Sequence, residues 1–341
     1  MAETQDQPLL QARSIVKYFP LKGGLFGRTT ATVHAVDDVS FSVDAGETLG
    51  IVGESGCGKS TTARLLMHLM KRDAGEIIYD GMAVGRALSL RELRRAMQMV
   101  FQDSYASLNP RLTIEESIAF GPKVHGMSEV ASRALARELL GKVGLRPENF
   151  ANRYPHEISG GQRQRVNIAR ALALSPRLVI LDEAVSALDK SVEAQVLNLL
   201  VDLKREFGLT YLFISHDLNV VRYISDRVLV MYLGEVVELG PVDDVWDQPA
   251  HPYTRALLAA MPSSDPDNRT EVPPITGDPP NPIDPPSGCR FHTRCPFAEA
   301  VCSGASPALT DIDAHGHQVA CYMFIPGASH SKAPPAGAMP S

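Results

Sequence analysis

The sequence contains few cysteines, and most of them stand close together. Five of the 341 residues are cysteines, and the first 288 residues contain only Cys57. The other four are Cys289, Cys295, Cys302 and Cys321. In a reducing compartment, clustered cysteines indicate metal ligands or redox groups rather than disulfides. The last sixth of the chain is therefore a candidate metal or redox region.

The sequence also lacks long apolar runs and an excess of basic residues. No run approaches the roughly 18 to 20 apolar residues that span a bilayer. The N-terminal stretch MAETQDQPLLQARS has neither the basic nor the apolar region of a signal peptide. The formal net charge of −6 gives no electrostatic reason to bind the phosphates of nucleic acid. We therefore expect a cytosolic chain without a nucleic-acid partner.

What the sequence does contain is an alternation of strand and helix patterns. With 44% hydrophobic residues it can bury a sizeable core, and its length suggests about two domains. Residues 36–52 predict a half-buried and then a buried strand, and Ser60–Met70 has the apolar spacing of a helix. RLVILDE and TYLFISHD predict buried strands separated by the helical SVEAQVLNLLVDLKREFG. This order predicts a largely parallel sheet with helices on its faces.

Other segments divide the chain further. Helical patterns dominate residues 88–165, among them SLRELRRAMQ, which predicts a helical subdomain inserted into the α/β core. RVLVMYLGEVVELG predicts a hairpin, and AHPYTRALLAAM a short helix. Nine of the 25 residues at 262–286 are proline, which predicts an extended connector. We expect a main domain over 8–260, a connector and cysteine-bearing extension over 261–325, and a disordered tail over 326–341, with disorder from about Ser329.

A phosphate-binding motif follows the buried strand. GESGCGKS matches G-x-x-x-x-G-K-[ST] and lies between a predicted strand and a predicted helix, so a plain flexible turn is disfavoured. Its glycines let backbone N–H groups converge on phosphate oxygens, Lys59 would reach the β- and γ-phosphates, and Ser60 would bind Mg²⁺. The nucleotide-binding residues expected here are Gly53, Glu54, Ser55, Gly56, Cys57, Gly58, Lys59, Ser60 and Thr61.

A second candidate anion site lies in ISGGQRQR. Ser159 stands where a helix N-cap is expected, two glycines follow, and QRQRVNIARALAL continues as a helix. A serine hydroxyl, exposed glycine N–H groups and a helix dipole can bind an anion without lysine. If the chain pairs head to tail with a similar partner, Ser159–Gln162 of one subunit can close over the γ-phosphate held by the other.

Together these motifs resemble those of the ABC transporter ATPase family, whose LSGGQ signature appears here as Ile158–Gln162. The resemblance implies the RecA-like α/β core of P-loop NTPases, with ATP and Mg²⁺ as ligands. It implies that Asp182, at the end of LVILDE, helps to hold Mg²⁺ with Ser60 and Gln102. Glu183 would polarise the attacking water.

The same resemblance assigns three further roles. Gln102, which ends MVFQ, matches the Q-loop that senses γ-phosphate and lies where membrane subunits dock. His216 matches the switch histidine, and SALD, which ends at Asp189, matches the loop that contacts the opposite subunit. A lone Gln or His at a strand end usually has only a structural role. Five motifs in the order of the family favour the functional interpretation instead. The residues expected to contact the partner's ATP are Ser159, Gly160, Gly161, Gln162 and Asp189.

Four details depart from or refine the family pattern. The family commonly reads DEPTSALD, whereas this chain reads DEAVSALD and keeps both acids. Cys57 stands within the phosphate motif, where we interpret it as a tolerated small residue rather than a redox switch. In VKYFP we expect Phe19 to stack on adenine, since the family aromatic usually lies two positions after such a lysine, with Tyr18 as the alternative. LKGGLFGRTTATVH is an insertion relative to minimal members, expected to form a hairpin tip.

The C-terminal third narrows the resemblance. HPYTRALLAAMP, followed by GDPPNPIDPPSGCRFHTRCP, resembles the ATPase subunits of oligopeptide and dipeptide importers, especially the second of their two non-identical ATPases. This implies a peripheral protein at the cytoplasmic face of the bacterial inner membrane that powers peptide import. Its partners would be a second ATPase subunit in a head-to-tail heterodimer, two transmembrane permeases and, indirectly, an extracytoplasmic binding protein. Nickel, glutathione or another small solute is the alternative cargo, and a soluble ABC ATPase outside transport is the alternative of another class.

The four clustered cysteines follow the spacing C-x5-C-x6-C-x18-C. This matches neither common zinc ribbons nor bacterial ferredoxins, so spacing alone leaves zinc and iron–sulfur open. Members of the peptide-importer subfamily carry a [4Fe-4S] cluster in this extension, and the resemblance therefore favours the cluster over zinc. Its expected role is to hold a proline-rich segment that cannot build its own core.

Overall fold

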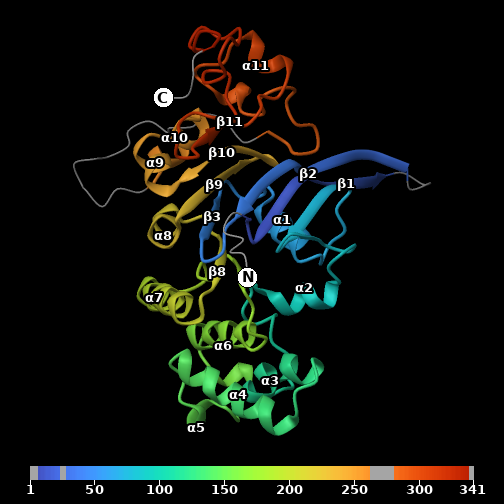
Figure 1. Ribbon diagram of the computed structural model, residues 1–341, viewed down its shortest axis with the longest axis vertical. Helices are drawn as coiled ribbons and strands as arrows, with labels where there is room; N and C mark the ends of the chain where they lie inside the picture. Colours follow the sequence, from blue (N-terminus) through green and yellow to red (C-terminus); the bar gives the residue numbers. More distant parts are fainter. Residues whose placement is uncertain (1–6, 24–27, 262–279, 338–341) are drawn as a thin grey trace, which may run out of the picture. The chain divides into compact units, whose positions relative to one another are not determined.

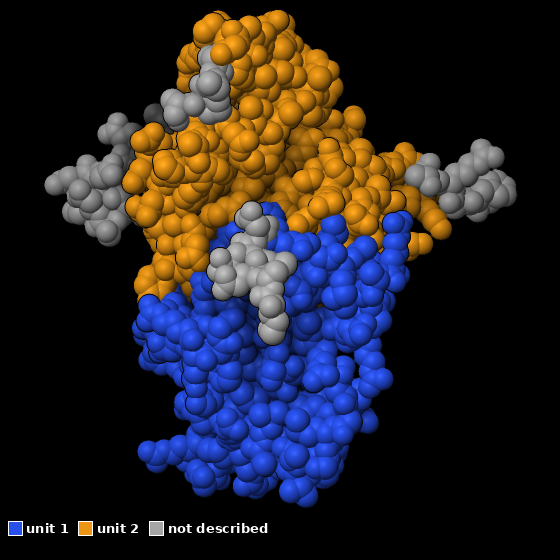
Figure 2. Space-filling view, viewed as in Figure 1, with its two compact units in different colours: residues 1–10, 42–48, 78–215 blue, residues 11–41, 49–77, 216–341 orange. Residues whose placement is uncertain are grey.

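The computed structural model describes residues 7–23, 28–261 and 280–337. The elements are labelled in Figure 1, and Figure 2 colours the two compact units into which the chain divides. Unit 1 comprises residues 1–10, 42–48 and 78–215, and unit 2 comprises residues 11–41, 49–77 and 216–341. No helix among the described residues is both long enough and apolar enough to cross a bilayer.

Unit 1 contains a parallel sheet whose central strands are buried. β7 (Leu178–Asp182) pairs in parallel with β6 (Met97–Val100) on one side and β8 (Thr210–Ile214) on the other. Every residue of β7 and β8 is buried, as expected for a parallel strand covered on both faces. α7 (Lys190–Phe207) links the two strands and ends at Gly208, whose φ of 62° suits glycine. The predicted strands and their connecting helix are confirmed.

The helical part of unit 1 packs α3 (Ile114–Val124) and α4 (Glu129–Lys142) against α6 (Gly160–Leu172). α2 (Leu90–Ala96), α5 (Pro147–Phe150) and the 3₁₀ turn at Pro155–Glu157 complete it. The prediction that SLRELRRAMQ is helical throughout was wrong at its end. The helix stops at Ala96, because Met97–Val100 pairs beside β7 as a strand.

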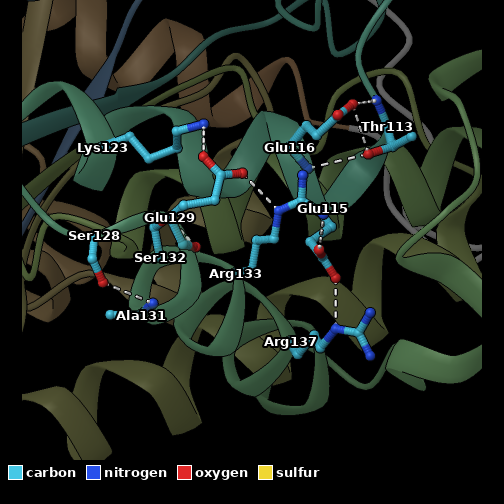
Figure 3. Close-up of polar contacts among 10 residues, drawn as sticks. All are labelled: Thr113, Glu115, Glu116, Lys123, Ser128, Glu129, Ala131, Ser132, Arg133 and Arg137. Atoms are coloured by element: carbon cyan, nitrogen blue, oxygen red, sulfur yellow. Dashed lines mark hydrogen bonds and ion pairs between the residues drawn. The ribbon is translucent and has the colours of Figure 1, made fainter.

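Polar contacts join α3 to α4 (Figure 3). The Glu115 side chain of α3 is only 4% exposed, and it accepts a hydrogen bond from Nε of Arg137 at 2.6 Å. Arg133 of α4 lies 3.5 Å from the same carboxylate. α3 begins with a capping box formed by Thr113 and Glu116. Two guanidinium groups thus lie beside one buried carboxylate. Their positive charges offset the electrostatic cost of burying it.

Unit 2 contains most of two sheets. β3 (Thr48–Val52) runs parallel to β9 (Arg227–Tyr232), which forms the predicted hairpin with β10 (Glu235–Pro241). β12 (Gln318–Val319) pairs with β10 and with β11 (Thr310–Asp311). In the other sheet, β1 (Leu10–Gly23) lies between β2 (Arg28–Val43) and β4 (Ala74–Tyr79). The end of β4 pairs with β5 (Met82–Ala83) in unit 1.

The helices of unit 2 are short. α1 (Lys59–Leu66) follows β3 and ends four residues before the predicted Met70, since Met67 already forms its C-cap. The others are α8 (Leu218–Ile224), α9 (Val242–Asp247), α10 (Pro252–Ala259), the 3₁₀ turn His292–Arg294 and α11 (Ala300–Gly304). α10 confirms the predicted short helix.

Three predicted segments lie partly outside the described residues. The connector is described only from Pro280 onward, and the expected hairpin tip only on either side of residues 24–27. In the expected tail, residues up to 337 are described, and the Ser331 amide donates to Glu299 at 3.0 Å.

A buried carboxylate joins the C-terminal segment to β10. Glu238 is fully buried, and its oxygens accept hydrogen bonds from the backbone amides of Ala250 at 2.7 Å and His251 at 2.9 Å. Nε2 of His317 lies 2.8 Å from the same carboxylate. Since buried acids need such partners, this network fixes α10 and the strand β12 to the hairpin. The part of the chain over residues 280–337 is called the extension below.

Candidate nucleotide-binding site

The phosphate loop, residues 53–60, requires glycine at two positions of unit 2. Gly53 has a φ of +147°, and a Cβ atom there would lie 2.2 Å from the carbonyl oxygen of Met231. Gly58 has a φ of +108°, and its Cβ would lie 2.2 Å from the carbonyl oxygen of Ala35. Gly58 is also the N-cap of α1, so no cap side chain occupies the first-turn amides. The loop therefore presents backbone N–H groups in the manner of an anion site.

Lys59 is folded over this loop. It is only 5% exposed, and its Nζ donates hydrogen bonds to the carbonyl oxygens of Gly53 at 2.7 Å and Glu54 at 3.0 Å. The ammonium group is therefore held at the loop rather than in bulk solvent. A cation at this position can bind the terminal phosphates of a nucleotide.

Cys57 is buried within the same loop. Burial raises the pKa of its thiol, and the nearby Lys59, whose Nζ lies 3.8 Å from the sulfur, lowers it less. Since the thiolate is the reactive form, this thiol is poorly suited to redox chemistry at neutral pH. The environment of Cys57 supports its interpretation as a tolerated small residue.

The two candidate aromatics have different surroundings in unit 2. The Tyr18 hydroxyl donates to Oδ1 of Asp37, and its ring centroid lies 4.4 Å from that of His34. Burial and the Asp37 carboxylate raise the pKa of Tyr18 to about 12, so the hydroxyl stays protonated. Phe19 has Nζ of Lys17 over its ring, 5.4 Å from the centroid. Stacking of Phe19 on adenine stays a prediction.

The expected hydrolytic residues of unit 1 meet at the end of β7. Asp182 is the last residue of the strand and is buried. Glu183 follows with a φ of +48°, its amide donates to Ile214 at 2.9 Å, and its Oε2 accepts a hydrogen bond from Nε2 of Gln102 at 2.7 Å. Left-handed backbone at a residue other than glycine is uncommon and recurs at functional sites. The structure thus joins two predicted catalytic residues that are 81 positions apart.

The loop after Glu183 folds back onto it. The Ser186 hydroxyl donates to the Glu183 carbonyl oxygen at 3.0 Å, and Asp189 is the exposed N-cap of α7. His216 is exposed and lies in unit 2, before α8, whose N-cap is Asp217. Unit 1 therefore holds Gln102, Asp182 and Glu183, and unit 2 holds the phosphate loop and His216.

The signature segment begins α6 as predicted. The Ser159 hydroxyl accepts a hydrogen bond from the Gln162 amide at 3.3 Å, and the Gln162 side-chain oxygen accepts one from the Ser159 amide at 3.0 Å. This capping box fixes the first turn of a 13-residue helix. Ser159 is exposed, so the helix N-terminus is open to an anion from outside the unit.

Sequence reasoning missed two residues of α6 that hold the Q-loop. Asn167 is fully buried, donates to the Ser104 carbonyl oxygen at 3.0 Å and accepts a hydrogen bond from the Ser107 hydroxyl at 3.0 Å. Arg170 donates to the Ser107 carbonyl oxygen. The available signal was a polar residue within the apolar run VNIA, which indicates a buried hydrogen-bonded group. The segment after Gln102 is thereby tied to the signature helix.

We expect Gly161→Ala to destabilise the protein by about 1–3 kcal/mol, because an added Cβ would lie 2.5 Å from Cγ1 of Val192 in α7. Gly160→Ala is the matched control, since its Cβ would meet only Nη2 of Arg163, at 4.0 Å. Denaturant titration measures both. Adding Val192→Ala to the first variant removes the crowding methyl group and should recover most of the loss. A double variant as unstable as Gly161→Ala would show that the overlap is not the cause.

The four clustered cysteines of unit 2 line one small cavity. Cys289, Cys295, Cys302 and Cys321 all border it and are free thiols. Burial raises the pKa of Cys289 to about 12 and that of Cys321 to about 11. Across the described ranges, no three His, Cys, Asp or Glu side chains are placed so that they could hold one metal ion.

His251 borders the same cavity. Its Nδ1 accepts a hydrogen bond from the Tyr253 amide at 3.0 Å, and burial lowers its pKa to about 4, so the ring is neutral and carries its proton on Nε2. Within the described part of the chain, this buried Nε2 has no hydrogen-bond partner. A buried N–H beside four thiols is suited to donate to sulfur of a bound group.

Comparisons with known proteins agree with these motifs. Residues 36–186 match the ABC transporter family, and residues 237–302 match the family described as oligopeptide/dipeptide transporter, C-terminal region. A probable peptide ABC transporter ATP-binding protein of Sinorhizobium fredii is 52% identical, over 96% of this chain and 93% of the relative. The oligopeptide transport ATP-binding protein AppF of Bacillus subtilis is 50% identical, over 95% of this chain and 100% of the relative.

Solved structures are also similar. A dimeric ATP-binding cassette in a post-hydrolysis state with ADP and Pi matches with a TM-score of 0.59 and 31% identity, over 68% of this chain and 98% of the other. CbiO1 of Clostridium perfringens matches with a TM-score of 0.61 and 26% identity, over 71% of this chain and 92% of the other.

Proposed function

The chain belongs to the ATP-binding proteins of ABC transporters, in their oligopeptide/dipeptide branch, and we propose that it hydrolyses ATP to power peptide import. One observation carries the proposal. The ATP-binding motifs and the oligopeptide/dipeptide C-terminal region occur in order in a single chain, at residues 36–186 and 237–302. The names of the two relatives cited above both describe peptide transport.

In the proposed reaction each unit contributes a separate part. The phosphate loop and Lys59 of unit 2 bind the phosphates of ATP through backbone N–H groups and one ammonium. In unit 1, Gln102 orients the carboxylate of Glu183, which accepts a proton from the attacking water. Mg²⁺ neutralises phosphate charge when it is bound, and the residues proposed to hold it are Ser60, Gln102 and Asp182.

We further propose that the active form is a head-to-tail pair with a second, non-identical ATPase subunit. Support comes from the exposed N-terminus of α6, which has the chemistry of an anion site in a unit that lacks the phosphate loop. Ser159, Gly160, Gly161, Gln162 and Asp189 would then contact the partner's ATP. A similar solved cassette is described as dimeric.

The proposed assembly includes two membrane permeases at the cytoplasmic face of the inner membrane, served by an extracytoplasmic binding protein. Unit 1 exposes apolar side chains on α3 and α4, where Phe120 is 61% exposed and Val130 is 80% exposed. Exposed large apolar side chains are a feature of protein contact surfaces. These helices are therefore suited to receive a permease segment.

We propose that the four clustered cysteines hold a [4Fe-4S] cluster, with zinc as the alternative. Its support is that four thiols border one cavity, which His251 with its buried, unpartnered Nε2 also borders, although no three metal-ligating side chains among the described residues are placed to hold a single ion. Such a cluster would be held by the four cysteine thiolates and would tie the extension together through its iron atoms, a role that needs no electron transfer. Anaerobically purified protein should contain four iron and four sulfide per chain with broad absorbance near 400 nm, as expected for the cluster type. Stoichiometric zinc without iron would contradict the cluster.

The test of the main proposal is transport by the assembled complex. A strain that lacks this chain should fail to grow on defined dipeptides or oligopeptides as the sole source of a required amino acid, and it should grow normally in nickel-limited medium. Loss of growth only under nickel limitation would replace peptides by nickel as the cargo. Tagged chain that copurifies with no membrane permease would favour a soluble ABC ATPase instead.

A further inference from the structure

Two arginines of the extension point back into the nucleotide-binding part of unit 2. Arg290 directly follows Cys289, and Arg294 directly precedes Cys295. Their side chains are only 6% and 7% exposed, although guanidinium groups usually lie at the surface. Buried guanidinium groups require specific partners, so the contacts of these two side chains identify what the extension holds.

Arg290 contacts residues beside Tyr18, one of the two candidate aromatics. One Nη donates to Oδ2 of Asp37, the other Nη donates to the carbonyl oxygen of Leu233, and Nε lies 3.0 Å from Oε1 of Glu235. Asp37 also accepts the hydrogen bond of the Tyr18 hydroxyl. The planar guanidinium thus bridges three groups that a lysine could not reach together.

The charges around Arg290 explain why it is needed. Burial alone would raise the pKa of Asp37, but hydrogen bonds from Tyr18, His34 and Arg290, with the guanidinium charge, lower it overall. Burial raises the pKa of Glu235 to about 7, and Arg290 opposes that rise. Asp37 and Glu235 would repel one another without a cation. Arg290 is therefore one of three side chains that hold Asp37 in place, and Asp37 in turn accepts the hydrogen bond of the Tyr18 hydroxyl.

Arg294 contacts the phosphate loop itself. Its Nη1 lies 3.4 Å from Oε2 of Glu54, the second residue of the loop, and 3.3 Å from the Tyr232 hydroxyl. The Glu54 amide donates to the Tyr253 hydroxyl at 2.9 Å, so the backbone and the side chain of this residue are both held.

Phe291 fixes the segment that carries both arginines. It is buried against Tyr232, with ring centroids 5.4 Å apart in an edge-to-face arrangement, and against Tyr253, with centroids 5.5 Å apart. Tyr232 and Tyr253 are the residues whose hydroxyl groups meet Arg294 and Glu54. Upstream, the Pro282 carbonyl oxygen accepts a hydrogen bond from the His34 amide at 2.9 Å. The extension is therefore attached at several points, both beside the phosphate loop and beside the segment that carries His34 and Asp37.

We propose that the extension contributes to nucleotide binding. Arg294 positions the phosphate loop through Glu54. Arg290 positions Tyr18, one of the two candidate adenine-stacking residues, through Asp37. Both are positioning residues, since each would act on the nucleotide through the residues that it contacts. The inference rests on the proposed ATPase function. It adds that nucleotide affinity depends on two side chains about 240 to 250 positions after the residues they hold.

The two arginines should affect different parts of the ligand. The test measures the dissociation constants of Mg·ATP and of tripolyphosphate, which has the phosphate chain but no base, with the full-length protein. Arg294→Ala should weaken both ligands by about tenfold, a typical energetic coupling between contacting residues. Arg290→Ala should weaken Mg·ATP by about tenfold and leave tripolyphosphate within about twofold. Lys332→Ala, which removes an exposed cation of the same extension, should change neither.

Conservative variants separate positioning from folding. Arg290→Lys and Arg294→Lys keep the charge but lose the planar fork, so each should reproduce the ligand pattern of its alanine variant at an unchanged Tm. In a double-mutant cycle, Glu54→Gln and Arg294→Ala together should cost no more affinity than Arg294→Ala alone.

Two results would overturn the inference. One is wild-type affinity for both ligands in folded Arg290 and Arg294 variants, and the other is full additivity of Glu54→Gln with Arg294→Ala. A wild-type protein that binds no Mg·ATP would instead refute the proposed function, so the two failures are distinguishable.

Discussion

Glu183→Gln is expected to slow ATP hydrolysis by about a hundred- to thousandfold in the assembled transporter, while ATP affinity stays unchanged. The amide at position 183 cannot accept the proton of the attacking water. Its carbonyl oxygen can still accept the 2.7 Å hydrogen bond from Nε2 of Gln102, so the local geometry should persist. Single-turnover hydrolysis and nucleotide binding, measured separately on the same preparation, test both parts.

The arrested variant should also retain ATP in a closed pair with its partner ATPase, visible as a stable dimer on size-exclusion chromatography. Glu206→Gln is the matched control, because this glutamate is 45% exposed and pairs with Lys142 on the surface. It should hydrolyse ATP at the wild-type rate. Normal turnover in Glu183→Gln would remove Glu183 from the catalytic role.

Lys59→Ala is expected to lower ATP affinity by about a hundredfold or more. It thus differs from Glu183→Gln, which should leave ATP affinity unchanged. The Nζ of Lys59 is held at the loop by the carbonyl oxygens of Gly53 and Glu54, in position to exchange these partners for phosphate oxygens. Charge-assisted hydrogen bonds to phosphate are about twice as strong as neutral ones. Their loss should therefore remove a large part of the free energy of ATP binding. Equilibrium binding of Mg·ATP measures the change.

Lys71→Ala serves as the control for this variant, since Lys71 is exposed in the segment between α1 and β4. Its affinity for ATP should equal that of the wild type. If Lys59→Ala bound ATP normally, residues 53–60 would not be the phosphate site. The two variants together test the proposed binding in unit 2 separately from the proposed hydrolysis in unit 1.

Local patterns predicted much of the secondary structure correctly. The apolar runs of β7 and β8 predicted buried parallel strands because such strands are covered on both faces. The N-cap at Ser159 followed from residue types within one helical turn. In contrast, Met97 and Gln98 continued a helical pattern, and only the pairing of Met97–Val100 beside β7 made them part of a strand. Tertiary contacts override local propensity in such cases.

The sequence by itself determined the chemistry of this protein. Its phosphate loop, its signature segment, the acid pair at Asp182 and Glu183 and the four clustered cysteines can all be read from short stretches, because each motif depends on neighbours in the chain. Only the tertiary structure decided which of these groups meet. Gln102 bonds to Glu183, and Arg294 reaches Glu54 over 240 positions, because packing rather than sequence spacing brings distant side chains together.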